Sequence, residues 1–303
     1  MTAQPITSGQ VRQICAFGTV AIEKVLEGLG LSKEEVQCVI ENGDEFTGAV
    51  RTACEQTIQR LRAPADYADE EVASTYGYLS GYTKPSGITE QANQLRDVFP
   101  GLGYVNLDYQ AKIEKGEIEL PKFAEGWFCI PNWIKNPTLF GGTYSSAVKK
   151  IFEVLKKARN GNFCNYREGE IDEVHLRQSA RTVAYFQKLS DAQGNPDILI
   201  VPAQFGILHR GKSIRRARVV FQSNECGLGA FAIGCMFLTH SNRLAQLDDL
   251  WIDCSGDEFA PGAVGQFVCA PVFGFYGGIL KFCAFRVGDA YPRCGSASAL
   301  LPE

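Results

Sequence analysis

The segment from 264 to 294 constrains the fold of this 303-residue chain more than any other part. It reads VGQFVCAPVFGFYGGILKFCAFRVGDAYPRC and is rich in Phe, Gly and Cys. Its residues alternate as in two β-strands, and the Gly277–Gly278 pair between them is typical of a tight hairpin turn. Alternation places Phe273, Phe275 and Phe282 on one face, which we expect to supply the core.

The opposite face of this hairpin and the loop after it carry a mixture of residue types that suits recognition. Exposed Tyr and Arg beside Gly are typical of adaptable binding surfaces, whereas Gly inside a strand packs against nothing. Two core strands buried on both faces are the simpler alternative. We predict a ligand-binding surface in which the rings supply apolar area and the arginines supply charge-assisted hydrogen bonds. Its contact residues are Val272, Gly274, Tyr276, Cys283, Phe285, Arg286, Tyr291, Pro292, Arg293 and Cys294.

The first part of the chain, residues 1–120, is expected to form a small helical domain. Ser8 can cap a first helix that ends at Gly28 and Gly30. Ser32 and Glu35 have the spacing of a capping box at the start of a second helix. The sequence DEFTGAVRTACEQTIQRLR predicts a third helix, and ITEQANQLRDV predicts another before a proline.

Residues 121–303 are expected to form a second, α+β domain. Two amphipathic helices are predicted over 143–161 and 174–194, and in the first of them Val148 and Ile151 share the apolar face. A buried strand follows at 197–201, and short strands with frequent Gly occupy the rest.

Composition excludes several classes of protein. The net charge of −4 gives no general attraction to nucleic acid or to anionic membranes. No apolar run is long enough for a membrane span, and the amino terminus lacks the pattern of a secretion signal. The eleven cysteines form no CxxC pair, and the three histidines lack zinc-finger spacing. We therefore expect reduced thiols, a cytoplasmic location and no cofactor or metal.

One motif favours a different function. The segment Gly206–Ser213 reads GILHRGKS and satisfies the phosphate-binding pattern G-x-x-x-x-G-K-S, with Lys212 as the phosphate ligand. Four residues separate it from the preceding strand, however, and too few helix–strand units follow it to build the sheet that such a loop needs. A nucleotide-binding enzyme is therefore the alternative hypothesis.

Two further groups of residues could carry chemistry. Asp253, Asp257 and Glu258 could gather around a hard cation, although an acidic turn after a strand explains them equally. Cys254 or Cys269 could pair with His209 or His240 as an activated nucleophile. No recognised signature surrounds either cysteine, and buried Cys more often fills small apolar space.

Several stretches of the second domain resemble a known group of sequences. They are QSARTVAYFQKL, DILIVPAQFGILHRGKSIRRAR, NECGLGAFAIGCMFLTH, LWIDCSGDEFAPG and the ending GSASALLP. They look like a group of hypothetical bacterial proteins that we associate with the variable proteins of diversity-generating retroelements. The resemblance covers roughly residues 125–303. It implies a C-type lectin-like fold whose C-terminal segment is rewritten by error-prone reverse transcription at template adenines.

The resemblance also implies a codon bias in the segment. Randomising the adenines of an AAY codon cannot produce Lys, Glu, Gln, Met or Trp, and only Gln266 and Lys281 between 264 and 294 belong to those types. Two features depart from the family pattern, since the chain ends on GSASALLPE and lacks a secretion signal. We expect a non-enzymatic binding protein that recognises a protein ligand through a variable surface.

Overall fold

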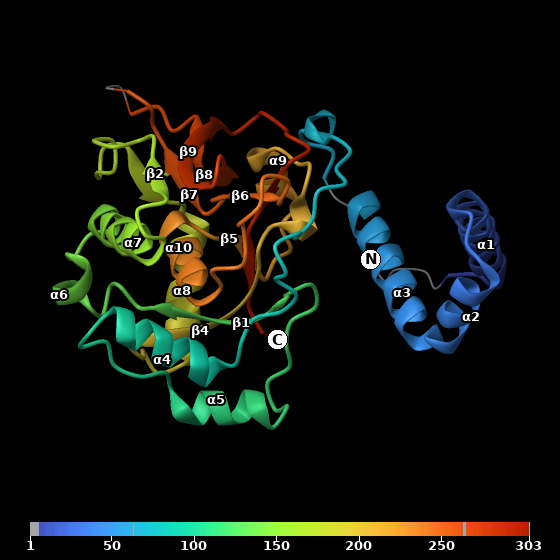
Figure 1. Cartoon of the computed structure of the whole chain (residues 1–303), viewed down its shortest axis with the longest axis horizontal. Helices are drawn as coiled ribbons and strands as arrows, with labels where there is room; N and C mark the ends of the chain where they lie inside the picture. Colours follow the sequence, from blue (N-terminus) through green and yellow to red (C-terminus); the bar gives the residue numbers. More distant parts are fainter. Residues whose placement is uncertain (1–5, 63, 263–264, 303) are drawn as a thin grey trace. The chain divides into compact units, whose positions relative to one another are not determined.

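The computed structural model of the chain describes residues 6–62, 64–262 and 265–302 (Figure 1). The chain divides into two compact units between residues 63 and 64. The first unit consists of the helices α1 (Ser8–Leu29), α2 (Lys33–Glu41) and α3 (Gly43–Arg62). The predicted capping box of Ser32 and Glu35 begins α2, whereas α1 is capped by Thr7 and not by Ser8.

The unit boundary lies earlier than the sequence suggests. We expected the helical domain to extend to residue 120, but the helices α4 (Ile88–Val98) and α5 (Leu107–Glu114) belong to the second unit. There α4 packs against β1 (Gly126–Pro131) and α10 (Ala230–Thr239), and its Leu95 is completely buried. Burial of an apolar helix face decides which unit a helix joins, and periodicity alone does not show the surface that covers it.

The second unit contains two β-sheets. The smaller has the order β1-β4-β11-β5 and is antiparallel, and the larger has the order β10-β6-β8-β7-β3, with β9 beside β8 and β2 beside β9. The remaining strands are β2 (Phe163–Asn165), β3 (Leu176–Gln178), β4 (Ile198–Gln204), β5 (Glu225–Gly227), β6 (Trp251–Asp253), β7 (Asp257–Phe259), β8 (Cys269–Tyr276), β9 (Ile279–Arg286), β10 (Cys294–Ser296) and β11 (Ser298–Leu300).

Helices cover these sheets and enclose the core. The helices not yet named are α6 (Pro137–Phe140), α7 (Tyr144–Ala158), α8 (Ala180–Ala192) and α9 (Ile214–Val220), with the short 3₁₀ helices η1 (Ala68–Glu70) and η2 (Ile207–His209). In Figure 1, α7 lies beside α10. As predicted, Val148, Ile151, Phe152 and Leu155 form the buried face of α7.

The second amphipathic helix is shorter than predicted. Residues 176–178 form β3, because they pair with β7 through the register Leu176↔Phe259, and α8 begins only after the cap Ser179. The α+β class is confirmed, with a helical amino-terminal part followed by a part rich in sheet. Within the described residues, no helix combines the length and the apolar character needed to cross a bilayer.

Candidate binding surface

Strands β8 and β9 form the predicted hairpin. They pair antiparallel along their whole length, with Tyr276 opposite Ile279 at the turn. Gly277 and Gly278 have φ values of 63° and 78°, the left-handed region that a two-residue hairpin turn requires and that glycine adopts without strain. The glycine pair therefore fixes the register of the two strands.

The inner face of this hairpin belongs to the core, as predicted. Phe273 and Phe282 are completely buried, and their ring centroids lie 5.1 Å apart. The ring of Phe152 on α7 lies 4.5 Å from that of Phe282. Phe275, nearer the turn, is half-buried.

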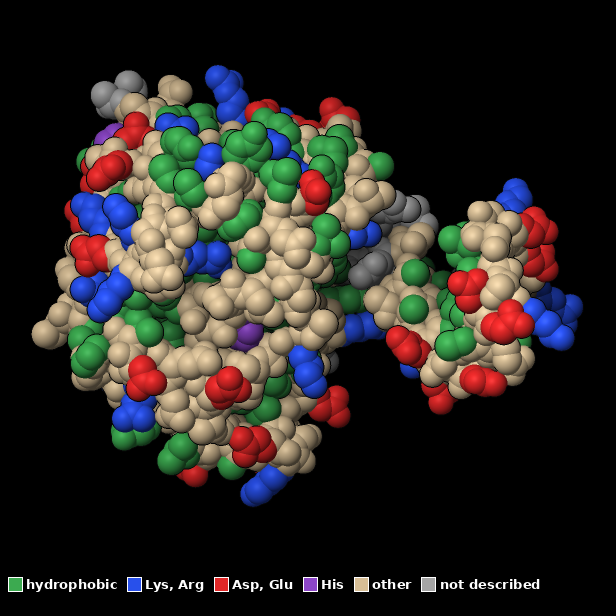
Figure 2. Space-filling view, in the orientation of Figure 1, with side chains coloured by type: hydrophobic (Ala, Val, Ile, Leu, Met, Phe, Trp, Pro, Cys, Tyr) green, Lys and Arg blue, Asp and Glu red, His purple; other side chains and the backbone are tan. Residues whose placement is uncertain are grey.

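The other side of the hairpin carries rings and cations of graded exposure, from the exposed Tyr276 and Arg293 to Trp251, which is only 9% exposed. We call it the outer face and define it by Trp251, Tyr276, Lys281, Cys283, Phe285, Tyr291 and Arg293. Figure 2 shows hydrophobic side chains interleaved with Lys and Arg over the part of the surface where β8 and β9 lie in Figure 1. The face is therefore a mixed aromatic and basic surface.

Trp251 on β6 organises the centre of the outer face. Its ring stacks on that of Phe285 at 6.4 Å, with an angle of 18° between the planes, and Tyr291 lies 5.0 Å beyond Phe285. The indole also lies against Gly274, where a Cβ atom would stand only 2.6 Å from the ring. Glycine at this position is thus what allows the tryptophan to lie flat on the sheet.

The cations of the surface lie on aromatic rings. Lys281 Nζ is 4.8 Å from the ring centroid of Tyr276 and 5.3 Å from that of Tyr166, and the Arg293 guanidinium is 4.2 Å from the Trp251 ring. Such contacts hold a cation in place without neutralising it. Within the part of the chain that the structure describes, no carboxylate forms a salt bridge with either cation.

The structure places seven of the ten predicted contact residues where solvent reaches them. Tyr276, Arg286, Pro292 and Arg293 are exposed, and Cys283, Phe285 and Tyr291 are half-buried. Arg286 ends β9 and, by alternation, points to the opposite side of the sheet from Phe285.

Three predicted contact residues are buried, which corrects the sequence assignment. Val272 is inaccessible because it lies on the central strand between Asp253 of β6 and Cys283 of β9. Cys294 is 1% exposed because it begins β10 beside Trp251. Gly274 is covered by the indole. Alternation assigns these residues to a face but cannot show which larger side chains cover it.

Sequence reasoning missed two residues of this surface. The sequence indicates Trp251 only as part of a strand, and it gives no reason to single out Tyr166, whose ring is 58% exposed beside Lys281. Both come from strands or loops distant in sequence from 264–294. Gly274 leaves room for a large ring on its strand, and this is the sequence feature that could have indicated a role for Trp251.

A buried carboxylate lies beneath the outer face. Asp253 is only 3% exposed, and its side chain accepts no hydrogen bond from any residue that the structure describes. Burial raises the pKa of Asp253 to about 7. The folded protein therefore retains this proton between about pH 4 and pH 7, where an unfolded chain has lost it.

Asp253→Asn is expected to change the pH dependence of stability. With the folded pKa raised, the free energy of unfolding falls as pH rises through this window, by up to about 1 kcal/mol for each pH unit. The variant lacks this ionisation, so its stability relative to the wild type should increase as pH rises from about 4 to 7. Urea unfolding at several pH values measures the difference, with the exposed Asp108→Asn as control. If the difference in free energy of unfolding between the variant and the wild type did not vary with pH, the raised pKa of Asp253 would be contradicted.

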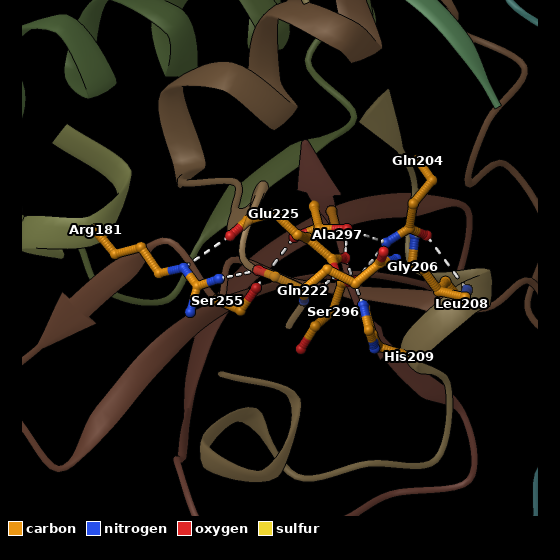
Figure 3. A network of polar contacts seen from close by, with 11 residues as sticks. Arg181, Gln204, Gly206, Leu208, His209, Gln222, Glu225, Ser255, Ser296 and Ala297 are labelled. Atoms are coloured by element: carbon orange, nitrogen blue, oxygen red, sulfur yellow. Dashed lines mark hydrogen bonds and ion pairs between the residues drawn. The ribbon is translucent and has the colours of Figure 1, made fainter. Parts of the chain in front are cut away.

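A buried polar network anchors the end of the C-terminal segment (Figure 3). The Glu225 carboxylate lies 2.7 Å from the His209 ring and accepts a hydrogen bond from the Ser298 hydroxyl. Gln204 donates to both Ser296 and Ser298 at 2.9 Å. Burial raises the pKa of the Glu225 carboxyl, but the His209 charge and the hydrogen bonds outweigh it and leave the pKa below its usual value. The GSAS sequence thus joins the two sheets.

The geometry of Gly206–Ser213 does not favour phosphate binding. A phosphate-cradling loop needs backbone N–H groups that are free to point at the ligand. Here the N–H of Gly206 donates to Gln204, that of Gly211 to the Cys294 carbonyl and that of Ser213 to the Glu70 carbonyl. These donors are already used within the protein.

The three acidic residues that could have gathered around a cation are dispersed. Asp257 accepts hydrogen bonds from the Tyr144 hydroxyl and the Ala230 N–H at the start of α10, whereas Glu258 pairs with Arg177 at 2.7 Å. Across residues 6–62, 64–262 and 265–302, no three acidic, His or Cys side chains are grouped so that they could hold a metal ion.

The possible Cys–His pairs, which the sequence did not favour, do not form either. His209 contacts Glu225, and the His240 ring accepts from the Ser86 N–H. Burial raises the pKa of the Cys254 and Cys269 thiols, which disfavours the nucleophilic thiolate.

The arrangement as a whole suits recognition, since rigid rings and unneutralised cations lie on a scaffold fixed from below. Comparison of the chain with protein-family models, with curated proteins and with solved structures finds no significant match to any of them.

Proposed function

We propose that this chain is a ligand-binding protein that recognises another protein through the outer face and the loop of residues 287–293. One observation supports it most directly. The hairpin buries Phe273 and Phe282 on its inner face, whereas Tyr276 on its outer face and Arg293 in the following loop are exposed. These exposed side chains can change without altering the core.

A broad surface favours a protein over a small molecule. Small ligands are held in concave pockets, whereas protein interfaces are wide and depend on a few Tyr, Trp and Arg anchors. Tyr276, Tyr291 and Arg293 provide these residue types, and the buried Trp251 packs beneath Arg293.

We further propose that the C-terminal segment is diversified, as in the variable proteins of diversity-generating retroelements, on a C-type lectin-like scaffold. The sequence resemblance and the scarcity of excluded residue types between 264 and 294 support this. A cytoplasmic location is part of the proposal, and the free cysteines are compatible with a reducing compartment. Sequencing the flanking DNA tests diversification. A reverse transcriptase gene and a near-copy of these codons, differing mainly at adenines, are expected, and their absence would remove this part of the proposal.

Substituting the exposed contact residues together is expected to abolish binding and leave the fold intact. In the variant Tyr276→Ala, Pro292→Ala and Arg293→Ala, no replaced side chain lies in the core. The melting temperature should therefore move by only about 2 °C. The dissociation constant for a protein ligand should rise at least roughly 100-fold, since anchors of these types dominate binding.

The ligand for this measurement is first captured from a lysate and purified, and its affinity is then measured by calorimetry. A control variant carries Tyr104→Ala, Val174→Ala and Leu247→Ala, which are exposed positions outside the outer face. The control should bind like the wild type. Equal affinities of the two variants would show that the ligand binds elsewhere, and a large fall in melting temperature would show that the contact residues are structural.

A further inference from the structure

Helix α1 presents an apolar stripe that α2 and α3, the other helices of the first unit, leave largely exposed. The α1 stripe consists of Val11, Ile14, Gly18, Ile22 and Val25, whose spacing of three or four residues places them on one side of the helix. No residue of α1 is buried, and Ile14 and Val25 are 64% and 59% exposed. Because helices in proteins draw most of their stability from packing such a face, the α1 stripe requires a covering surface.

The pattern of the α1 stripe matches a reversed copy of itself. Reversing the helix about Gly18 exchanges Val11 with Val25 and Ile14 with Ile22. Two copies in antiparallel orientation therefore place apolar residues opposite one another at each level, as a twofold interface requires. A Cβ atom built on Gly18 would find nothing within 4 Å, so the two helices can approach closely at the centre.

The charged residues beside the α1 stripe and the apolar area of the helix are both compatible with this antiparallel pairing. Arg12 and Glu23 lie along the same edge of the α1 stripe, and reversal about Gly18 brings Arg12 near Glu23 of the partner subunit. Val11, Ile14, Val25, Leu26 and Leu29 are between 38% and 64% exposed, and together they offer on the order of 500 Å² of apolar surface per copy. This area is typical of a reversible dimer rather than a permanent one.

We propose that two copies of this chain associate through the α1 stripe as an antiparallel, twofold-symmetric pair of helices. The dimer carries two outer faces. It can therefore engage a multivalent target more tightly than a single chain does.

Sedimentation velocity of the full chain tests the proposal. The apparent mass should rise from 33.2 kDa toward twice that value between about 1 and 100 µM, as expected for a reversible dimer. Val25→Asp should keep the chain monomeric. Val20→Asp is the matched control, because Val20 is 49% exposed on the opposite side of the helix and should leave the dimer unchanged.

A double variant, Val11→Lys with Val25→Asp, tests the antiparallel register. In an antiparallel pair the lysine at position 11 meets the aspartate at position 25 of the other copy, so the dimer should return. In a parallel pair like charges would face each other instead. Circular dichroism confirms that the variants have equal helix content. A monomeric wild type, or equal effects of Val25→Asp and Val20→Asp, would overturn the proposal. Failure of the double variant to recover the dimer would overturn the antiparallel pairing.

Discussion

Replacing Asp249 by alanine is expected to lower the free energy of unfolding of the second unit by about 4 kcal/mol. Asp249 is completely buried, and its carboxylate accepts hydrogen bonds from the backbone N–H groups of Leu79 at 2.7 Å and of Ala245 and Gln246 at 2.8 Å. The Ser80 hydroxyl and N–H donate to it as well. Alanine would leave all these donors without a partner.

The buried cation Arg243 adds to the loss, because the Asp249 carboxylate is one of the charges that influence it. Its Nη2 donates to the Leu250 carbonyl at 2.8 Å, and its guanidinium lies 3.9 Å from the Tyr78 ring centroid. Burial lowers the pKa of Arg243, and the negative charges of Glu125 and Asp249 oppose that effect. Without Asp249, part of the charge that compensates this buried cation is lost.

Tryptophan fluorescence during urea unfolding measures the effect in the second unit alone, because Trp127, Trp133 and Trp251 all belong to it. The control is Asp248→Ala, an exposed carboxylate one residue away, which should cost less than about 0.5 kcal/mol. Similar losses in both variants would show that the carboxylate of Asp249 does not hold the segment of residues 77–80 against the start of β6.

This prediction could not have come from the sequence. The residues LDDLW show two adjacent acids, but only the fold brings one of them to the backbone of Leu79 and Ser80, about 170 positions earlier. Arg243 likewise has no local partner that would mark it as buried. Long-range polar contacts of this kind carry no periodic signal.

Local patterns were sufficient for the hairpin and for the helices with strong caps or apolar faces. Gly277–Gly278, the alternation of Phe273 and Phe282, and the Ser32 capping box act over a few residues, so the sequence shows them directly. The exposed fraction of each side chain on the outer face could not be predicted in this way, because it depends on neighbouring strands. Val272 is buried because of its neighbours on β6 and β9, and Trp251 packs on the same side of the sheet because β6 pairs with β8.

The separation between the two faces of the hairpin can be measured with two phenylalanines on one strand. Phe282→Ala is expected to lower the free energy of unfolding by about 4 kcal/mol, as for a fully buried ring whose removal leaves a cavity. Its ring is inaccessible and contacts those of Phe152 and Phe273. Phe285→Ala, three positions later on the outer face, should cost only about 1 kcal/mol, chiefly its ring contacts with Trp251 and Tyr291.

Both variants replace a phenylalanine of β9 by alanine. The difference between their losses in free energy of unfolding therefore reports the burial of the two rings. Urea unfolding at pH 7 with tryptophan fluorescence measures both variants, and circular dichroism of the folded state confirms that each retains its secondary structure. Equal losses near 4 kcal/mol would mean that both faces are core, and an outer face that is core could not vary without unfolding the protein. A small loss for Phe285 would instead show that the scaffold tolerates change at its surface, which is the physical condition that a diversified binding site requires.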